Sequence, residues 1–398
     1  MTPQIWERGL ILERLRALKM ARSTHAYVRG NTEKFYEWLA ASRSALGLPT
    51  GPAVWICGDC HLGNLGPVAS ANCEVNVQIR DLDQTVIGNP AHDLIRLGVS
   101  LATAARGSDL PGVTTARMIE EMVQGYDHAL SLGDEDETPE PNVVRSVRRR
   151  ALGRRWRHLA QERLSDVEPR LPLGKKFWAL DQTEREQLES LFSQDNVRSA
   201  ILLLKGRDES DRLRLVDAAY WRKGCSSLGK LRYAALVEIS GSKKGKDGYA
   251  LVDLKEAVDA VAPASDAAQM PEDNAERVVA GAQALAPNLG ERMLATRLLG
   301  RPVVLRELMP QDLKVEVDQF SRSEATKAAR YLAYVVGTAH ARQMSVSDRR
   351  SWRQTLAGRL HSDLEAPSWL WDSVVDLTAT HEAGYLEHCR RYALLDAA

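Results

Sequence analysis

Two short polar segments carry the residue types that metal-assisted group transfer requires. The first, residues 57–64, reads C-G-D-C-H-L-G-N, in which Asp59 can accept a hydroxyl proton and the amide oxygen of Asn64 can ligate Mg²⁺. The second places Asp81 and Asp83 after a predicted strand, whose alternation puts both carboxylates on one face, as a hard cation prefers. Each segment alone has a plainer interpretation as a polar turn or a surface acidic pair.

The first segment also invites a zinc or thiol interpretation, through Cys57, Cys60 and His61. No second cysteine pair follows at zinc-finger spacing, and no thioredoxin-like pattern surrounds the motif, so both are disfavoured. Asp93 is expected to cap its helix and brace the loop rather than react. Arg29 either touches a phosphate or caps the N-terminal helices, and both interpretations stay open.

The elements that must position these segments follow from hydrophobic periodicity. Each polar segment ends a short apolar strand, and helical patterns surround them. The predicted strands are 53–57 and 73–79, and the predicted helices are 1–45, 91–106, 321–344 and 352–396.

A different pattern of predicted elements begins after about residue 205. It consists of three strands, a helix and two strands: 212–221, 231–239, 249–255, 272–286, 292–299 and 302–308. Between the first two strands lies a Gly/Ser loop whose backbone N–H groups could approach phosphates; its members are Gly224, Ser226, Ser227 and Gly229. Lys255 ends the third strand, and Glu276 on the following helix is placed to pair with it. Glu307 and Met309 belong to a predicted hinge, residues 305–309.

The stretch from Asp81, D-L-D-Q-T-V-I-G-N-P-A-H-D-L, resembles the metal-binding segment of aminoglycoside and choline phosphotransferases. Residues 57–64 resemble their catalytic loop H-G-D-x-H-x-x-N, with Cys57 in place of the first histidine. The resemblance implies that Asp59 orients or deprotonates the substrate hydroxyl. It also implies that Asn64 and Asp81 hold Mg²⁺ on the nucleotide phosphates, with Asp83 a second ligand or a supporting group.

In kinases the Gly-rich lobe precedes the catalytic loop, whereas here it follows. Residues 331–341 resemble the helix that precedes the catalytic loop in those phosphotransferases, yet lie far downstream of it. We therefore expect an α+β, two-lobed, protein-kinase-like fold that is circularly permuted. Residues 1–205 and 311–398 would form the helical catalytic lobe, and residues 206–310 the small nucleotide-binding lobe.

The chain also resembles a bacterial family catalogued as domain of unknown function 2252, over nearly its whole length. The motifs that carry the resemblance are 20–30 (MARSTHAYVRG), 55–66 (WICGDCHLGNLG), 81–96, the Gly/Ser loop, 254–257, 304–308, Lys314 and 337–342. The chain departs from the family pattern at Leu82, where an aromatic residue is usual, and at Cys225 and Ser226, where glycine is more common.

Composition limits the partners. The 398 residues carry 53 basic and 53 acidic side chains, so no overall positive charge attracts nucleic acid. No apolar run is long enough to span a membrane. Five cysteines, an odd number, fit a reducing cytoplasm better than secretion. Residues 145–157 hold seven arginines, which indicate either a phosphate-binding patch or a solvated, locally paired helix.

We expect an ATP- and Mg²⁺-dependent phosphotransferase that acts on an unidentified hydroxyl-bearing acceptor; the arginine-rich stretch hints that the acceptor is anionic. Two alternatives stay open. One is a kinase-like enzyme that transfers AMP instead of the terminal phosphate. The other is a pseudokinase that serves as an interaction module, which the thinned Gly loop favours and the set Asp59, Asn64, Asp81 and Lys255 disfavours. The sequence predicts no oligomeric state.

Overall fold

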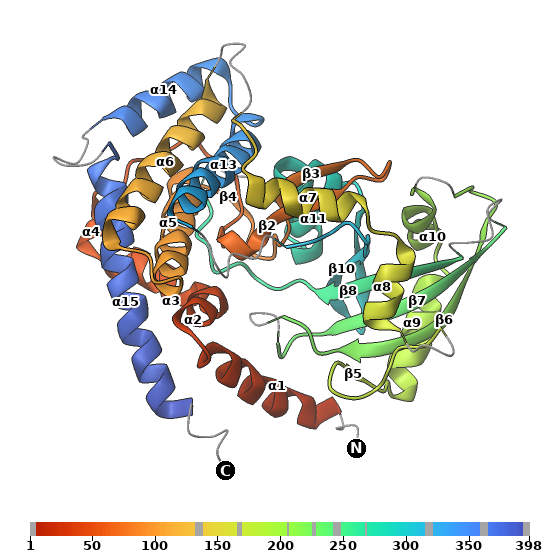
Figure 1. Cartoon of the computed structure of the whole chain (residues 1–398). Coiled ribbons are helices and arrows are strands. Elements are labelled where there is room, and N and C mark those ends of the chain that lie inside the picture. Colours follow the sequence, from red (N-terminus) through yellow and green to blue (C-terminus); the bar gives the residue numbers. More distant parts are fainter. Residues whose placement is uncertain are drawn as a thin grey trace.

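The computed structural model describes residues 5–131, 138–164, 169–204, 207–224, 228–241, 248–266, 269–314, 321–358 and 365–392. Over these ranges the chain combines a six-stranded sheet and two two-stranded sheets with many helices, which confirms the predicted α+β class. Figure 1 shows the large sheet on one side of the molecule and most of the helices gathered on the other.

The large sheet is antiparallel throughout, with the strand order β5-β6-β7-β8-β10-β9. Its strands are β5 (Phe177–Trp178), β6 (Arg212–Trp221), β7 (Arg232–Ser240), β8 (Tyr249–Glu256), β9 (Met293–Leu298) and β10 (Arg301–Glu307). Five of them lie within a residue or two of the predicted strands, and β5 is an additional edge strand.

Both faces of this sheet are covered, so its central strands are almost continuously apolar. On one face, side chains such as Tyr233 and Val252 pack with Leu12, Leu188 and Ile201. These partners lie on α1 (Ile5–Met20), α9 (Gln182–Phe192) and α10 (Asp195–Leu202). The other face packs against α8 (Trp156–Arg163), and α11 (Asn274–Leu285) lies beside β9 and β10. The sheet therefore also draws on residues before position 206.

The remaining helices build the second and larger core. They are α2 (Thr24–Gly30), α3 (Thr32–Ala41), α4 (Arg43–Leu46), α5 (Pro90–Gly107), α6 (Gly112–Leu130), α7 (Asn142–Leu152), α12 (Pro287–Gly290), α13 (Arg322–Ala341), α14 (Val346–Ala357) and α15 (Ser368–Tyr392). In this core, apolar residues from 28–130 meet those from 325–377. Segments from the two ends of the chain thus pack as one body.

Two predicted helical segments are divided in the structure. The segment 1–45 falls on the four helices α1 to α4, and the segment 352–396 falls on two, with α14 ending at Ala357 and α15 beginning at Ser368. Gly358 caps α14 and Pro367 precedes α15, and both residue types interrupt helices.

The arginine-rich stretch falls on α7, α8 and the turn between them. Arg148 makes a two-pronged ion pair with Glu140, with N–O distances of 2.8 and 2.9 Å, and Arg154 pairs with Glu162 at 2.7 Å. Local pairing therefore accounts for these two arginines. Within the described ranges, none of the helices is long and apolar enough to cross a membrane.

Candidate functional site

A small hairpin brings the two polar segments together. Strand β2 (Leu65–Ala69) begins directly after Asn64, and β3 (Val75–Ile79) ends two residues before Asp81. The antiparallel register sets Leu65 opposite Ile79, and the backbone N–H of Arg80 donates to the carbonyl of Asn64 at 2.7 Å. The ends of the two segments therefore lie side by side. The sequence analysis missed β2, which contains both glycine and proline.

Helix α5 packs against the loop 57–64 and holds it in place. Asn89 caps this helix, and the Asp93 carboxylate accepts hydrogen bonds from the backbone N–H groups of Cys57 and Gly58, at 2.7 and 3.0 Å. Asp93 therefore braces the loop as predicted, whereas the capping residue is Asn89. Gly58 has a φ of +72° and a Cβ there would lie 2.1 Å from the carbonyl of Gln84, so the turn requires glycine.

Behind Asp93 lies a buried polar chain that the sequence analysis did not identify. His340 Nε2 lies 3.2 Å from Asp93 Oδ2, and its Nδ1 lies 2.9 Å from the Tyr126 hydroxyl. That hydroxyl accepts from the indole N–H of Trp352 at 3.2 Å. These hydrogen bonds link α13, α6 and α14 to the loop, so His340 has a structural role.

Asp59 is buried within the loop and paired with Arg96 of α5. The Arg96 Nε donates to Asp59 Oδ1 at 2.8 Å, and the Asn64 side chain donates to the Asp59 carbonyl at 3.0 Å. Burial raises the pKa of Asp59 even though Arg96 opposes the shift. Asp59 is thus a carboxylate with an elevated proton affinity, a property that suits a general base. Arg96 lies 37 residues from Asp59, and the sequence analysis did not predict this contact.

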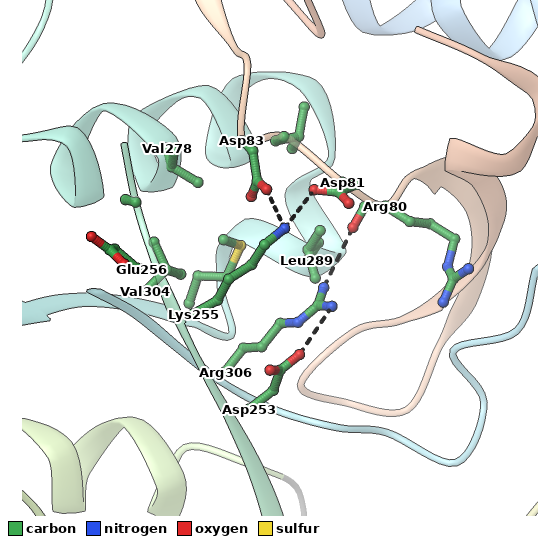
Figure 2. A pocket seen from close by; sticks show the side chains of 13 residues that line it. Arg80, Asp81, Asp83, Asp253, Lys255, Glu256, Val278, Leu289, Val304 and Arg306 are labelled. Atoms are coloured by element: carbon green, nitrogen blue, oxygen red, sulfur yellow. Dashed lines mark hydrogen bonds and ion pairs between the residues drawn. The ribbon is translucent and has the colours of Figure 1, made fainter. Parts of the chain in front are cut away.

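Asp81 and Asp83 meet Lys255 of the large sheet (Figure 2). The Lys255 ammonium lies 3.2 Å from Asp81 Oδ1 and also forms an ion pair with Asp83. Burial alone would raise the pKa of Asp81, but Lys255, Arg306 and Arg232 bring it well below its usual range. Burial and the neighbouring Asp81 charge instead raise the pKa of Asp83. One ammonium thus stands between two carboxylates of different proton affinity.

The pocket around Lys255 contains a second set of charges that the sequence analysis missed. Asp253, on the same face of β8, pairs with Arg232 at 2.6 Å and lies 3.6 Å from Arg306. Figure 2 shows Arg306 between Asp253 and the backbone of Arg80. The alternation of β8 places Asp253 beside Lys255, and this was the signal available in the sequence.

Other predicted site residues lie apart from this cluster. Glu276 is exposed on α11 and lines a separate hollow with Asn196 and Arg297, while the ammonium of Lys255 pairs with Asp81 and Asp83. Glu307 ends β10 in a buried ion pair with Arg207 at 2.5 Å.

The structure describes the whole predicted hinge and part of the Gly/Ser loop. Met309 packs against Ala69 and Val75 of the β2–β3 hairpin, so the segment after β10 joins the sheet to the hairpin. The carbonyl of Gly224 accepts a hydrogen bond from Lys19 of α1 at 2.9 Å, and Gly229 follows with a φ of +99°. Ser226 and Ser227 lie outside the described residues.

The donor set fits magnesium better than zinc. Within the described part of the chain, no group of three or more His, Cys, Asp or Glu side chains is arranged to hold a metal. Mg²⁺ commonly uses one or two carboxylates and completes its shell with water and substrate phosphates, and Asp81, Asp83 and Asn64 offer that partial set. A hydrogen bond with Cys60 and burial hold the pKa of Cys57 well above its ordinary value, which opposes a zinc thiolate.

Comparison with known proteins gives a family and no activity. Residues 11–391 match the model of a family described as an uncharacterized protein conserved in bacteria (DUF2252). The chain belongs to this family, which confirms the resemblance seen in its sequence motifs. Searches of the curated proteins and of the solved structures returned no match.

Proposed function

We propose that the chain is an ATP- and Mg²⁺-dependent phosphotransferase on a circularly permuted kinase-like fold. The observation that carries the proposal is the meeting of Lys255 with Asp81 and Asp83, next to the loop of Asp59 and Asn64. A lysine from an antiparallel sheet and acids from a separate hairpin meet here, although 174 residues separate Lys255 from Asp81.

The element order supports the permuted arrangement. The sheet region runs strand, Gly/Ser loop, strand, strand with Lys255, helix and two strands, which is the order expected of a kinase-like small lobe. The shared core of residues 28–130 and 325–377 agrees with a large lobe assembled from both ends of the chain. Surface termini permit such a rearrangement without loss of the core.

In this proposal Asp59 accepts the proton of the acceptor hydroxyl, and Arg96 holds its carboxylate in place. Asp81 and Asn64 would hold Mg²⁺, which would neutralise charge on the nucleotide phosphates. Asp83 assists Asp81. Lys255 leaves its two carboxylates and turns to the α- and β-phosphates. Positioning and charge stabilisation would supply most of the rate acceleration.

Glu307, Met309 and the Gly/Ser loop would contact the nucleotide from the sheet side. We leave Glu276 out of the proposed site because it is exposed in a separate hollow. The four described cysteines are free thiols, which supports the proposed cytoplasmic location.

The first test is thermal unfolding with and without ATP and Mg²⁺. A ligand at a hundredfold excess over its Kd stabilises the folded state by about 2.7 kcal/mol. We expect a metal-dependent rise in Tm for the native chain and for Asp372→Ala, an exposed control on α15, and no rise for Asp81→Ala. The absence of any rise with common nucleotides would contradict the proposal and favour an interaction module.

The second test is turnover and product mass. Asp59→Asn should lose at least about a hundredfold in turnover while still binding ATP, because general-base catalysis contributes about that much or more. A mass gain of one phosphate on the acceptor agrees with the proposal, and a gain of AMP would replace it with nucleotide transfer. Native-like turnover in Asp59→Asn would exclude Asp59 as the base.

A further inference from the structure

Three basic side chains gather beside the catalytic loop, and among the described residues none of them forms an ion pair with a carboxylate. They are Arg29 of α2, Arg80 after β3, and Lys314 in the segment after β10. Neither Arg29 nor Lys314 has an ion-pair partner among the described residues, and the Arg80 guanidinium donates to the backbone carbonyl of Asp312 at 3.2 Å. The carboxylate of Asp312 is itself engaged by Arg292, at 3.0 and 3.1 Å.

Contacts along the chain connect these three positions. The Arg29 guanidinium packs on Gly63 so closely that a Cβ at Gly63 would lie 2.9 Å from its central carbon. The next residue, Asn64, accepts the backbone hydrogen bond of Arg80. Arg80 in turn contacts Asp312, two residues before Lys314. Desolvation lowers the pKa of Lys314, and the charges of Arg29 and Arg80 lower it further, which places all three within electrostatic reach.

Collecting like charges costs folding free energy, so such a cluster is more readily explained by an anion than by stability. Asp81 lies near the cluster, but its carboxylate is already paired with Lys255. Beside Arg29, the buried Nδ1 of His61 has no hydrogen-bond partner among the described residues. The described residues of this neighbourhood therefore offer positive charge and an unused polar atom, while the nearby carboxylates of Asp81 and Asp312 already pair with Lys255 and Arg292.

We propose that Arg29, Arg80 and Lys314 form an anion site that binds a phosphate group at the catalytic loop. The inference rests on the proposed function. The phosphate belongs either to the acceptor, which is then a phosphate-bearing molecule, or to the nucleotide, as its terminal phosphate. Arginine and lysine serve both sources in the same way, by charge-assisted hydrogen bonds.

The test is calorimetric titration of inorganic phosphate, at constant ionic strength, into the native chain and three variants. Arg29→Gln and Lys314→Gln each remove one charge from the cluster. Arg350→Gln, at an exposed position on α14, removes one charge elsewhere and is the matched control. A lost charged hydrogen bond should weaken phosphate binding by about tenfold or more in the first two variants and leave the control unchanged. Lys314 is exposed, so its variant keeps the test valid if Arg29→Gln fails to fold.

Titration of ATP and ADP with Mg²⁺ into the same proteins distinguishes the two sources. If the cluster binds the terminal phosphate, the Arg29 and Lys314 variants lose affinity for ATP but not for ADP. If it binds an acceptor, both nucleotides keep their affinity, and phosphate still binds to the ATP-loaded native chain. Equal phosphate affinity in all four proteins, or none in the native chain, overturns the proposal. Phosphate binding without nucleotide binding would refute the phosphotransferase proposal and leave the anion site standing.

Discussion

Asp81 and Asp83 share one ammonium and yet differ in electrostatic character. The pKa of Asp81 is lowered because Lys255, Arg306 and Arg232 outweigh burial, whereas the pKa of Asp83 is raised by burial and by Asp81 itself. Asp81 therefore gains from ionisation in the folded state and Asp83 loses by it. Lys255 offsets the repulsion between the two carboxylates only in part. Burial would lower the pKa of Lys255, but the two carboxylates raise it.

The first prediction sets Asp81→Asn against Asp83→Asn in the nucleotide-free protein at pH 7. The pKa of Asp81 lies below its unfolded value of about 3.9, so its stabilisation is present above that pH and is lost only in stronger acid. The raised pKa of Asp83 means that stability falls as the pH rises through it, and the deficit persists at neutrality. Asp81→Asn should therefore lower Tm, and Asp83→Asn should raise it.

Thermal unfolding between pH 4 and 8 checks this prediction, with the exposed Asp372→Asn as control. The advantage of Asp83→Asn should shrink as the pH falls, because the native Asp83 then becomes protonated. A lower Tm for Asp83→Asn at pH 7 would show that its pairing with Lys255 outweighs the repulsion from Asp81.

The second prediction concerns divalent metal without nucleotide. The Lys255 ammonium lies between two carboxylates, where it competes with a cation for the same charge. Lys255→Met should bind Mn²⁺, a spectroscopic substitute for Mg²⁺, about tenfold more tightly than the native chain, since the acidic pair is no longer neutralised. Electron paramagnetic resonance measures the free Mn²⁺. Lys327→Met on the exposed face of α13 is the control, and unchanged affinity in Lys255→Met would argue against metal binding at these carboxylates.

At the scale of elements, the sequence predicts long periodic segments well and short ones poorly. Strand β6 was predicted with its observed bounds, and α5, α11 and α13 within three residues. The strands β2, β4 (Val86–Gly88) and β5 were missed, because β2 contains glycine and proline and the other two have only three and two residues. They are defined by pairing with a partner rather than by an apolar pattern of their own.

The residues of the candidate site also differ in how directly the sequence indicates them. Asp59, Asn64, Asp81 and Asp83 stand in short motifs that a sequence displays directly. Arg96 and Arg306 lie in motifs that carry the family resemblance, but neither was assigned a role from the sequence, because their contacts arise only when α5 packs against the loop and β10 pairs with β8. Glu276 was misplaced for a related reason, since a helix position alone does not say which face meets the sheet.

The third prediction tests the packing of α6 on α13, which supports His340 and hence the loop. A Cβ on Gly125 would lie 2.0 Å from the carbonyl oxygen of Arg330, whereas a Cβ on Gly112, in the same helix, would meet nothing within 4 Å. Gly125→Ala should lower the free energy of unfolding by about 1–3 kcal/mol or more through overpacking. Gly112→Ala should be neutral or stabilising by about 0.4–1 kcal/mol. Urea titration of both variants measures the difference, and equal stabilities would contradict the close helix contact.

At the scale of the whole molecule, α1 connects the sheet to the helical core (Figure 1). Near its start, Arg8 forms a buried ion pair with Glu184 of α9, at 2.6 Å, and Tyr233 of β7 donates to the same carboxylate. Near its end, the carbonyl of Ala17 lies 2.8 Å from His388 Nε2 of α15. Any change in the angle between the large sheet and the helical core must therefore strain or break contacts of α1.

The fourth prediction is that the Arg8–Glu184 pair holds this connection. Arg8→Met strands a buried carboxylate and should cost about 3–5 kcal/mol of unfolding free energy. Adding Glu184→Gln removes the stranded charge and keeps an acceptor for Tyr233, so the double variant should recover most of the loss. Hydrogen exchange should rise in α1 and in β6–β7 of the single variant, while α5 and α13 stay protected, because their core contains none of the described side chains of α1. Uniform exchange across both bodies would instead mean that the chain unfolds as one unit, with α1 as part of its common core.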